Sequence, residues 1–461
     1  RVDPHHPGHA RNRPRLIYRI IRNEIMFESL DVPVFCDADV VIAGAGPAGI
    51  GAAIASAMQG RKTVLLEQTG SAGGMSTNSL IPIILHQGDG KRVVVGNICH
   101  SIVRDACAEM GIHEVHPLWQ SVDTEALKRV CDRRLLEAGV KVFYMIRIAD
   151  AIRRGNRIEA LLVATSSGLQ KVTGRVFVDC TGDGSVAAFA GVPFDKGDGD
   201  GNTMSPTLCA QYTNVDMARY REAKARGRSD RAIWMEMAEK GVSPVAEFHF
   251  PGFWEYSEKS GRANVGHLYG TDTLDDEQLT RAYIEGRKLA LVYHNFYREH
   301  VPGFENSELS QTAALMGVRE SRRIRGDYQL SGEDYRRRAS FPDEIGRFNY
   351  PIDIHSSGDV ARQKEVEKEL AATMYKWGEN YGVPYRALVA QEVENLLVGG
   401  RCISCDREAQ SSIRVIPGCF LTGQAAGAAA AMSAAGNGAV RSVDVEKLRA
   451  FLRDELEVYL P

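Results

Sequence analysis

The chain has 461 residues, which is enough for two or three domains and excludes a single small binding module. Hydrophobic residues make up 44% and charged residues 25%, a composition typical of globular proteins and unlike that of disordered or fibrous ones. The formal net charge of −3 provides no overall field for nucleic acid or an anionic membrane, so we expect neither as a partner.

Residues 1–36 are predicted to form an N-terminal arm. Its apolar stretches are too short for a secretion signal, and Met26 begins a run typical of a natural start. We therefore expect residues 1–25 to be a tag or upstream translation, with a genuine basic arm as the alternative. Nine cysteines without regular spacing indicate reduced thiols and a cytoplasmic protein. No membrane span is predicted, because the alanine-rich stretch 418–435 is short and weakly apolar.

A strand, a glycine turn and a helix follow the arm. The apolar run 39–43 leads into Gly44-Ala45-Gly46-Pro47-Ala48-Gly49, and an alanine-rich stretch continues to Gln59. A second apolar run, 63–66, ends at Glu67. This order predicts a β-α-β unit with a parallel, Rossmann-like sheet.

The rest of the chain divides by composition. Strands are expected near 140–148, 158–165 and 175–180; from residue 191 the sequence becomes aromatic, charged and loop-rich, with a helix near 276–300. After Pro384 a strand at 396–398 and a helix at 418–435 return to the first pattern. We predict an α/β fold in which a dinucleotide-binding domain, 37–190 and 386–461, is interrupted by an α+β substrate domain, 191–385.

The glycine turn has the spacing of a dinucleotide site. Gly44 permits a tight turn, Gly46 allows the pyrophosphate to approach the backbone, and Gly49 allows close packing of helix and strand. The helix N-terminus then offers free N–H groups to the phosphates. Glu67, 18 positions after Gly49, is placed to accept the ribose hydroxyls and would repel the 2′-phosphate of NADP.

A second glycine-rich loop, Gly70-Ser71-Ala72-Gly73-Gly74-Met75-Ser76-Thr77, favours FAD over NAD because it offers more backbone donors to a longer cofactor. With this loop the chain resembles the FAD-dependent oxidoreductases of the glutathione-reductase-like superfamily, on the branch shared with fumarate reductase. Segments 178–184, 319–324 and 395–402 are similar to further signatures of that family, and the resemblance spans about residues 37–435.

The resemblance implies FAD as cofactor and a glutathione-reductase-like FAD-binding domain. It implies that Thr181, Gly182 and Asp183 contact the cofactor near the pyrophosphate, that Ile148 lies along the adenine, and that Gly400 and Arg401 border the ribityl chain. The helix near Gly418 would direct its N-terminus at the flavin N1–O2 edge, where reduction places negative charge. The full set of expected cofactor contacts is Gly44, Gly46, Pro47, Ala48, Gly49, Glu67, Gln68, Gly73, Gly74, Met75, Ser76, Ile148, Thr181, Gly182, Asp183, Gly400, Arg401 and Gly418.

Three residues are the candidates for catalysis. Arg414 precedes the last long helix and could bind a substrate carboxylate or anchor only its own loop. His86 and His267 could each act as general acid or base, or be structural. The arginine cluster of segment 319–325 is expected to form ion pairs, with substrate binding as the alternative.

Three further motifs do not support a site. Cys402 and Cys405 have redox-pair spacing but are expected to be packed thiols, and His113 and His116 have no further ligands at zinc spacing. Segment 198–202 resembles the start of a calcium loop, but Thr203 stands where glycine is needed and Cys209 where the bidentate glutamate is needed. No metal site is predicted. The Thr-His pair that relatives often carry is replaced here by Cys405-Asp406-Arg407-Glu408.

We therefore predict an FAD-dependent oxidoreductase that transfers a hydride between flavin N5 and a small polar, including anionic, organic substrate, with an unidentified electron partner. The alternatives are a flavin monooxygenase and a non-catalytic flavin-binding protein.

Overall fold

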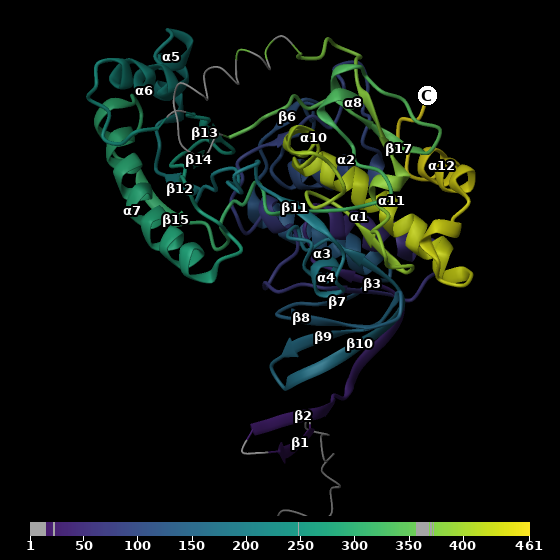
Figure 1. Cartoon of the computed structure of the whole chain (residues 1–461). Helices are drawn as coiled ribbons and strands as arrows, with labels where there is room; N and C mark the ends of the chain where they lie inside the picture. Colours follow the sequence, from purple (N-terminus) through teal and green to yellow (C-terminus); the bar gives the residue numbers. More distant parts are fainter. Residues whose placement is uncertain (1–14, 22–23, 248, 356–367, 369–370, 372) are drawn as a thin grey trace, which may run out of the picture.

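The structure, a computed structural model, describes residues 15–21, 24–247, 249–355, 368, 371 and 373–461, and for residues 15–31 it describes the backbone alone. Figure 1 shows a larger body with a smaller one beside it, and an N-terminal hairpin of β1 (Arg15–Ile21) and β2 (Glu24–Asp31). The other elements belong to these two bodies.

The elements of the larger body are β3 (Val34–Ala43), α1 (Pro47–Met58), β4 (Thr63–Leu66), η1 (Gly74–Ser76), β5 (Ile84–Leu85), α2 (Asn97–Glu109), β6 (Trp119–Gln120), α3 (Thr124–Glu137), β7 (Lys141–Phe143), β8 (Arg147–Arg154), β9 (Arg157–Thr165), β10 (Gly168–Asp179), α4 (Ser185–Phe189), β11 (Phe194–Lys196), β16 (Arg322–Ile324), α8 (Gly332–Arg336), β17 (Glu344–Phe348), β18 (Tyr381–Pro384), η2 (Tyr385–Ala387), β19 (Leu396–Val398), α10 (Arg407–Ile413), α11 (Ile416–Ala435), η3 (Val440–Ser442) and α12 (Val445–Asp454). Those of the smaller body are β12 (Ala210–Thr213), α5 (Met217–Ala225), α6 (Asp230–Glu239), β13 (Gly252–Glu255), β14 (Gly261–Asn264), α7 (Asp276–His300) and β15 (Glu308–Thr312).

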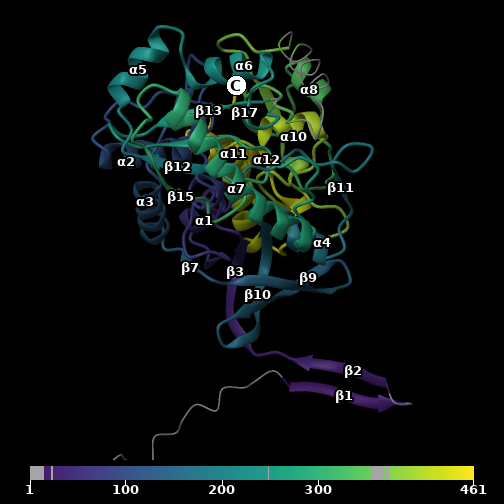
Figure 2. The same ribbon diagram turned by 90° about the vertical axis from the view of Figure 1, so that its left-hand side faces the viewer.

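The main sheet has seven strands in the order β7-β4-β3-β10-β9-β8, and β19 also pairs with β10. Strands β3, β4, β7, β10 and β19 are parallel, whereas β8, β9 and β10 form an antiparallel meander. The last four residues of β3 are buried and apolar, as expected for a parallel strand that is covered on both faces. The predicted parallel α/β sheet is thus confirmed. Figure 2 shows β9 and β10 extending away from the rest of the larger body.

Helices α1 and α11 pack against each other and hold the larger body together. A Cβ added at Gly423 would lie 2.0 Å from the backbone oxygen of Ala48, and one added at Gly427 would lie 2.0 Å from that of Ala52. Such distances allow only glycine, because backbone atoms cannot move aside as a flexible side chain can. The alanine and glycine content of 418–435 therefore reflects the close packing of α11 against α1.

The smaller body has an antiparallel sheet in the order β13-β14-β12-β15 and its own aromatic core, which includes Tyr212, Trp234 and Tyr297. Ile324 and Tyr381, by contrast, pack into the core of the larger body. The domain boundaries at 191 and 385 stay predictions, but residues beyond about 319 pack with the main sheet.

Most expected elements occur, with one correction. The helix expected near 276–300 is α7, and the strand at 396–398 is β19. The single strand expected at 140–148 is wrong: β7 lies beside β4, and β8 belongs to the meander on the other side of the sheet. Met145, with φ of 59°, turns the chain between them. The apolar pattern alone could not place this break, because both halves are strand-like.

No single helix of the described residues is long and apolar enough to cross a membrane; the bent pair α10 and α11 passes such a test by length and composition only.

The packing predicts that Gly427→Ala lowers stability strongly. The new Cβ would overlap the backbone oxygen of Ala52, so we expect a loss of about 2–4 kcal/mol in the free energy of unfolding. Chemical denaturation of the purified protein measures this loss. Gly199→Ala is the matched control, because a Cβ there meets nothing within 4 Å. Equal stability of the two variants would contradict the packing.

Candidate functional site

The turn between β3 and α1 is built for a close approach to its backbone. Gly44 has φ of +92°, and a Cβ there would lie 2.6 Å from the backbone oxygen of Cys180. A Cβ at Gly49 would lie 1.7 Å from the backbone oxygen of Gly44, so the helix sits directly on the turn. At Gly46, however, a Cβ would meet nothing within 4 Å. The middle glycine therefore faces open space, which is where a pyrophosphate would lie.

Glu67 lies at the end of β4 and joins the two glycine loops. Its Oε2 accepts a hydrogen bond from the backbone N–H of Ala45 at 2.7 Å, and its Oε1 accepts from the N–H and hydroxyl of Thr69, both at 2.8 Å. The side chain is only 6% exposed. The carboxylate is thus held beside the turn, where its remaining lone pairs can accept the ribose hydroxyls.

The second glycine loop lies against the first. The N–H of Gly73 donates to the backbone oxygen of Ala45 at 2.8 Å, and a Cβ at Gly74 would lie 2.8 Å from the Cα of Gly46. Both glycines have positive φ, and η1 follows with Met75 and Ser76. The second loop therefore packs beside the turn and leaves the open space at Gly46 free.

Two helix N-termini lie at this site without side-chain caps. Helix α1 starts at Pro47 and helix α11 at Ile416, and neither has an acidic residue in its first turn. A Cβ at Gly400 would touch Ala48 of α1 at 3.0 Å and the Sγ of Cys419, in α11, at 3.7 Å. The free N–H groups and partial positive charge of both ends are available to an anionic group. Gly418 stands in the first turn of α11.

Arg401 and Asp183 form an ion pair close to the two helix N-termini. Arg401 donates from Nη2 to Oδ1 of Asp183 at 2.5 Å, and its guanidinium stacks over Gly182, where a Cβ would lie 2.8 Å from Cζ. Thr181 instead donates to the buried Asp179. The Nε of Arg401 is buried without a partner among the described residues. A buried donor without a partner is costly, so the geometry fits a bound anionic cofactor.

The last two expected cofactor contacts are less informative. Gln68 is exposed next to Glu67, and Ile148 lies half-buried on β8. Their contact with the cofactor stays a prediction.

Arg414 lies between α10 and α11. Its Nη2 donates to the backbone oxygen of Asp353 at 3.0 Å and to Oδ2 of Asp353 at 3.1 Å. Its side chain is 11% exposed, and its Nε has no partner among the described residues. Arg414 therefore holds one carboxylate of the protein and keeps further donors available.

His267 is the centre of a buried chain of hydrogen bonds. Its Nδ1 lies 2.7 Å from Oε1 of Glu247, and its Nε2 lies 2.8 Å from Nδ1 of His355. His355 continues through its Nε2 to Oδ2 of Asp353 at 3.2 Å, and Asp353 is the partner of Arg414. The predicted residues Arg414 and His267, 147 positions apart along the chain, are thus joined through Asp353 and His355.

Glu247 is ionised in this chain. Burial by itself would raise its pKa, but the interactions with His267, together with bonds from the His267 N–H and the Tyr293 hydroxyl, lower that pKa to about 2. The N–H of Gly266 and the hydroxyl of Tyr269 also donate to it. Burial lowers the pKa of His267, which Glu247 opposes only in part.

His86, in the loop after β5, contacts segment 349–355, which contains Asp353 and His355. Its Nδ1 lies 3.3 Å from Oδ1 of Asn349, and its ring meets that of Tyr350 edge-on, with centroids 5.1 Å apart. Tyr350 donates to Oδ2 of Asp353 at 3.2 Å. His86 has φ of 58°, a strained conformation for a non-glycine residue. Burial lowers the pKa of its imidazole, with the bond to Asn349 acting against this.

Sequence reasoning missed Glu247, Asp353 and His355. Each is a single polar residue in a loop, and only the fold brings segments 247–267 and 349–355 together. The spacing Asp353-Ile354-His355 was the one signal that could have identified part of the cluster.

Two of the four arginines in segment 319–325 form ion pairs. Arg323 and Arg407 both bind Glu320, and Arg325 binds Asp195. Arg319 instead points toward the smaller body, where it donates to the backbone oxygen of Ser205 at 2.7 Å and to Thr207 at 2.8 Å. The expectation of ion pairs is confirmed for Arg323 and Arg325 of this segment.

Cys402 and Cys405 are buried free thiols, and burial raises the pKa of both. His113 and His116 are exposed.

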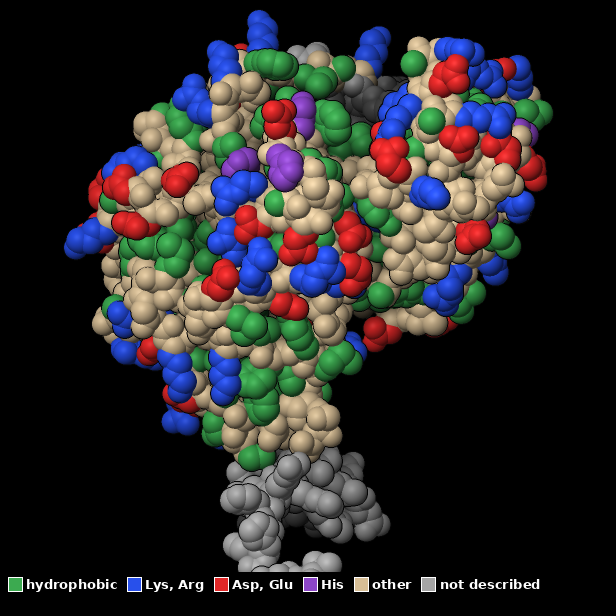
Figure 3. Space-filling model, turned by 180° about the vertical axis from the view of Figure 1, so that it is seen from behind, with side chains coloured by type: hydrophobic (Ala, Val, Ile, Leu, Met, Phe, Trp, Pro, Cys, Tyr) green, Lys and Arg blue, Asp and Glu red, His purple; other side chains and the backbone are tan. Residues whose placement is uncertain are grey.

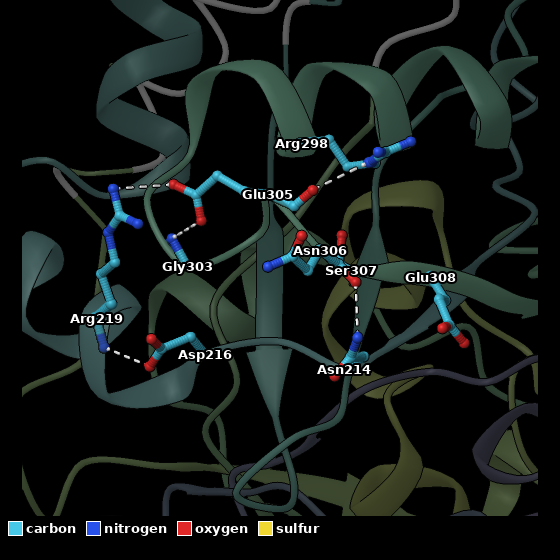
Figure 4. Close-up of a pocket in the computed structure, with 9 residues that line it drawn as sticks. All are labelled: Asn214, Asp216, Arg219, Arg298, Gly303, Glu305, Asn306, Ser307 and Glu308. Carbon is cyan, nitrogen blue, oxygen red and sulfur yellow. Dashed lines mark hydrogen bonds and ion pairs between the residues drawn. The ribbon is translucent and has the colours of Figure 1, made fainter.

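A separate hollow of about 660 Å³ lies in the smaller body (Figure 4). Its charged side chains bind one another: Arg219 pairs with Glu305 at 3.1 Å, and Glu305 accepts from the N–H of Gly303 at 3.0 Å. All of its lining residues belong to segments 214–219 and 298–308, so it contains none of the glycine loops or the buried histidines.

The role of Glu67 predicts that Glu67→Gln weakens FAD binding. The amide cannot accept hydrogen bonds at both atoms, so the ribose and the turn lose a charge-assisted acceptor, and we expect about 10–100-fold higher Kd for FAD. Fluorescence titration of the apoprotein with FAD measures this. Glu239→Gln, on the exposed end of α6, is the control and should bind FAD normally. Unchanged FAD affinity in Glu67→Gln would contradict the assignment.

Comparison with known structures gives distant likenesses. THI4 from Thermovibrio ammonificans is 22% identical with a TM-score of 0.27, over 34% of this chain and 64% of that one, less than two thirds of its length. A geranylgeranyl bacteriochlorophyll reductase-like protein from Thermoplasma acidophilum is 11% identical with a TM-score of 0.44, over 91% of this chain and 84% of that one. The flavin-dependent brominase Bmp2 is 14% identical with a TM-score of 0.43, over 91% and 84%. At these TM-scores the likenesses carry no argument about substrate.

No curated protein sequence gives a significant match. The family model for FAD dependent oxidoreductases, however, matches residues 39–452, which include both glycine loops, Arg401, Arg414 and the buried histidines. The chain therefore belongs to the FAD-dependent oxidoreductase family and is an enzyme that uses FAD.

Proposed function

We propose that this enzyme transfers a hydride between FAD and a small organic substrate that carries a carboxylate or a similar anionic group. The observation that carries the proposal is the convergence of Arg414 and His86 on segment 349–355 at the N-terminal end of α11. We also infer, from the motifs at 178–184, 319–324 and 395–402, that the chain lies on the glutathione-reductase-like branch related to fumarate reductase.

Bound FAD would supply the hydride acceptor or donor, and the chain's own residues orient the substrate and move the proton. The first turn of α11 and Arg401 lie where the cofactor's anionic parts would be held. Arg414, immediately before α11, faces the same region. A substrate beside Arg414 is therefore close to the flavin end of the cofactor.

Arg414 is suited to bind an anion. One edge of its guanidinium binds Asp353, and its buried Nε has no partner among the described residues. A guanidinium in a partly desolvated position binds a planar carboxylate through two parallel hydrogen bonds. Arg319 lies near Arg414. Burial, and then the charge of Arg414, lower the pKa of Arg319 to about 10, so Arg319 is still positively charged near pH 7. The free donors of Arg414 therefore favour an anionic substrate.

His86 is the better candidate for the proton transfer. Both ring nitrogens of His267 are already bonded within the protein, whereas His86 uses only Nδ1 among the described residues. The lowered pKa keeps its imidazole neutral near pH 7, so Nε2 can accept a proton. His267 then acts as a positioning residue that holds Asp353, through His355, against Arg414.

The reaction class is tested by anaerobic mixing of the FAD-loaded protein with small carboxylic acids and with the neutral amides of the same acids. Bleaching of the flavin by one of the acids, without oxygen or a nicotinamide, and not by its amide, supports the proposal. Product formation that requires both oxygen and a separate reductant would contradict it and support a monooxygenase. A protein that exchanges electrons with no small molecule would support the binding role.

If Arg414 binds the anionic group of the substrate, Arg414→Ala should slow flavin reduction by about 10–100-fold, because a charge-assisted pair contributes roughly 1.5–3 kcal/mol. FAD content should be unchanged, and Arg414→Lys should restore part of the rate. Arg154→Ala, whose side chain is 83% exposed, is the control. A normal rate in Arg414→Ala would remove this residue from the mechanism.

The proposed role of His86 as general base predicts that the rate of flavin reduction depends on pH. The pKa of His86 is lowered in the folded protein, so its neutral form predominates at and above pH 6.5 and is lost as the pH falls through that lowered pKa. The rate should therefore decline on the acid side. In His86→Asn the rate should be lower and this decline should disappear. An unaltered acid limb in that variant would assign it to another group.

A further inference from the structure

We propose that His249, Asp353 and His355 form a binding site for a divalent first-row transition-metal cation of the Zn²⁺ or Fe²⁺ type. One ligand atom from each residue lies within 4.8 Å of the others, and among the described residues no other group of three His, Cys, Asp or Glu has this property. Two imidazole nitrogens and one carboxylate oxygen are donors that such cations accept. This inference differs from the sequence analysis, which predicted no metal site, and does not depend on the proposed reaction.

The distance between the proposed ligand atoms of His355 and Asp353 fits a shared ion. Nε2 of His355 and Oδ2 of Asp353 lie 3.2 Å apart. Two atoms at that separation, each about 2.1 Å from one ion, subtend an angle of about 100°, between the octahedral and tetrahedral values. His249 stands nearly perpendicular to His355, with ring centroids 4.5 Å apart. Around a tetrahedral ion ligand atoms lie about 3.4 Å apart, so a side-chain rotation of His249 that closes at most about 1.4 Å completes the set.

The proposed ligands lie at one end of a buried chain of three close contacts. These join Glu247 to His267, His267 to His355, and His355 to Asp353.

The same chain has the arrangement that usually supports a metal-bound histidine. A ligating imidazole commonly donates its other N–H to a second group that ends in a carboxylate, which fixes its tautomer and orientation. Here Nδ1 of His355 lies 2.8 Å from Nε2 of His267, and Nδ1 of His267 lies 2.7 Å from Oε1 of Glu247. If His355 binds an ion through Nε2, its other nitrogen therefore has such a second group. Tyr350 and Arg414 hold the other ligand, Asp353, through its Oδ2. Both ends of the site are therefore oriented before any ion binds.

The proposed metal site is mostly buried but retains some access to solvent. The side chain of His355 is 5% exposed and that of Asp353 is 24% exposed. Three protein ligands leave at least one coordination position, as in catalytic metal sites. A cation there would face the same region as Arg414, so an oxygen atom of a substrate could be its fourth ligand.

The experiment is a calorimetric titration of the full-length, FAD-loaded protein with Zn²⁺ after treatment with a chelator, together with elemental analysis of the metal content. We expect one equivalent of Zn²⁺ in the parent protein. His249→Ala and Asp353→Asn should each bind it at least about 10-fold more weakly. The FAD content of both variants should match the parent, and so should the thermal unfolding of His249→Ala without Zn²⁺, which shows that the variants fold.

His113→Ala is the matched control, because it removes an exposed histidine far from the cluster in sequence. His113→Ala should bind one equivalent of Zn²⁺ with the affinity of the parent protein. The histidines at positions 5, 6 and 9 occur in every variant, so any binding by them cancels. Failure of the parent protein to bind one equivalent of Zn²⁺ tightly would overturn the proposal. Equal affinity in His249→Ala, or loss of binding in His113→Ala, would also overturn it.

Discussion

The close approach of α1 and α11 is the constraint on which the rest of the structure depends. Because Gly423 and Gly427 have no Cβ, the two helices can approach until each of these glycines lies against the other helix's backbone. Their uncapped N-termini consequently lie on either side of Gly400, at the carboxyl ends of the parallel strands β3 and β10. Ligands of open α/β sheets bind at this edge.

The buried polar chain connects the two bodies. Glu247 and His267 come from the smaller body, whereas Asp353 and Arg414 belong to segments packed on the larger one. Buried charges are tolerated only when they are paired and hydrogen-bonded, and here each carboxylate has several donors. In Figure 3 a groove separates the two bodies on one face, with acidic and basic side chains intermingled around it. The polar chain therefore fixes how the bodies meet, and it orients Arg414 at the same time.

The two halves of the site differ in how far sequence could predict them. The cofactor half rests on local backbone requirements: Gly44 needs a positive φ, and Gly49 needs room beside the turn. Such requirements restrict the residue type at fixed spacing, so they are visible in a single sequence. The catalytic half rests on single side chains from loops. His86 and Arg414 were recognisable as candidates, but for Glu247, Asp353 and His355 the short spacing Asp353-Ile354-His355 was the only signal.

By itself the sequence determined the parallel α/β sheet, its glycine turn, the carboxylate at Glu67, the helices at 276–300 and 418–435, and hence FAD. Each follows from interactions between residues close along the chain, where periodicity and glycine spacing act directly. Only the tertiary structure decided that the stretch 140–148 splits between two sides of the sheet, and that His267 meets Asp353 through His355. Those contacts join segments far apart along the chain, and they are set by how the two bodies pack, which no local pattern encodes.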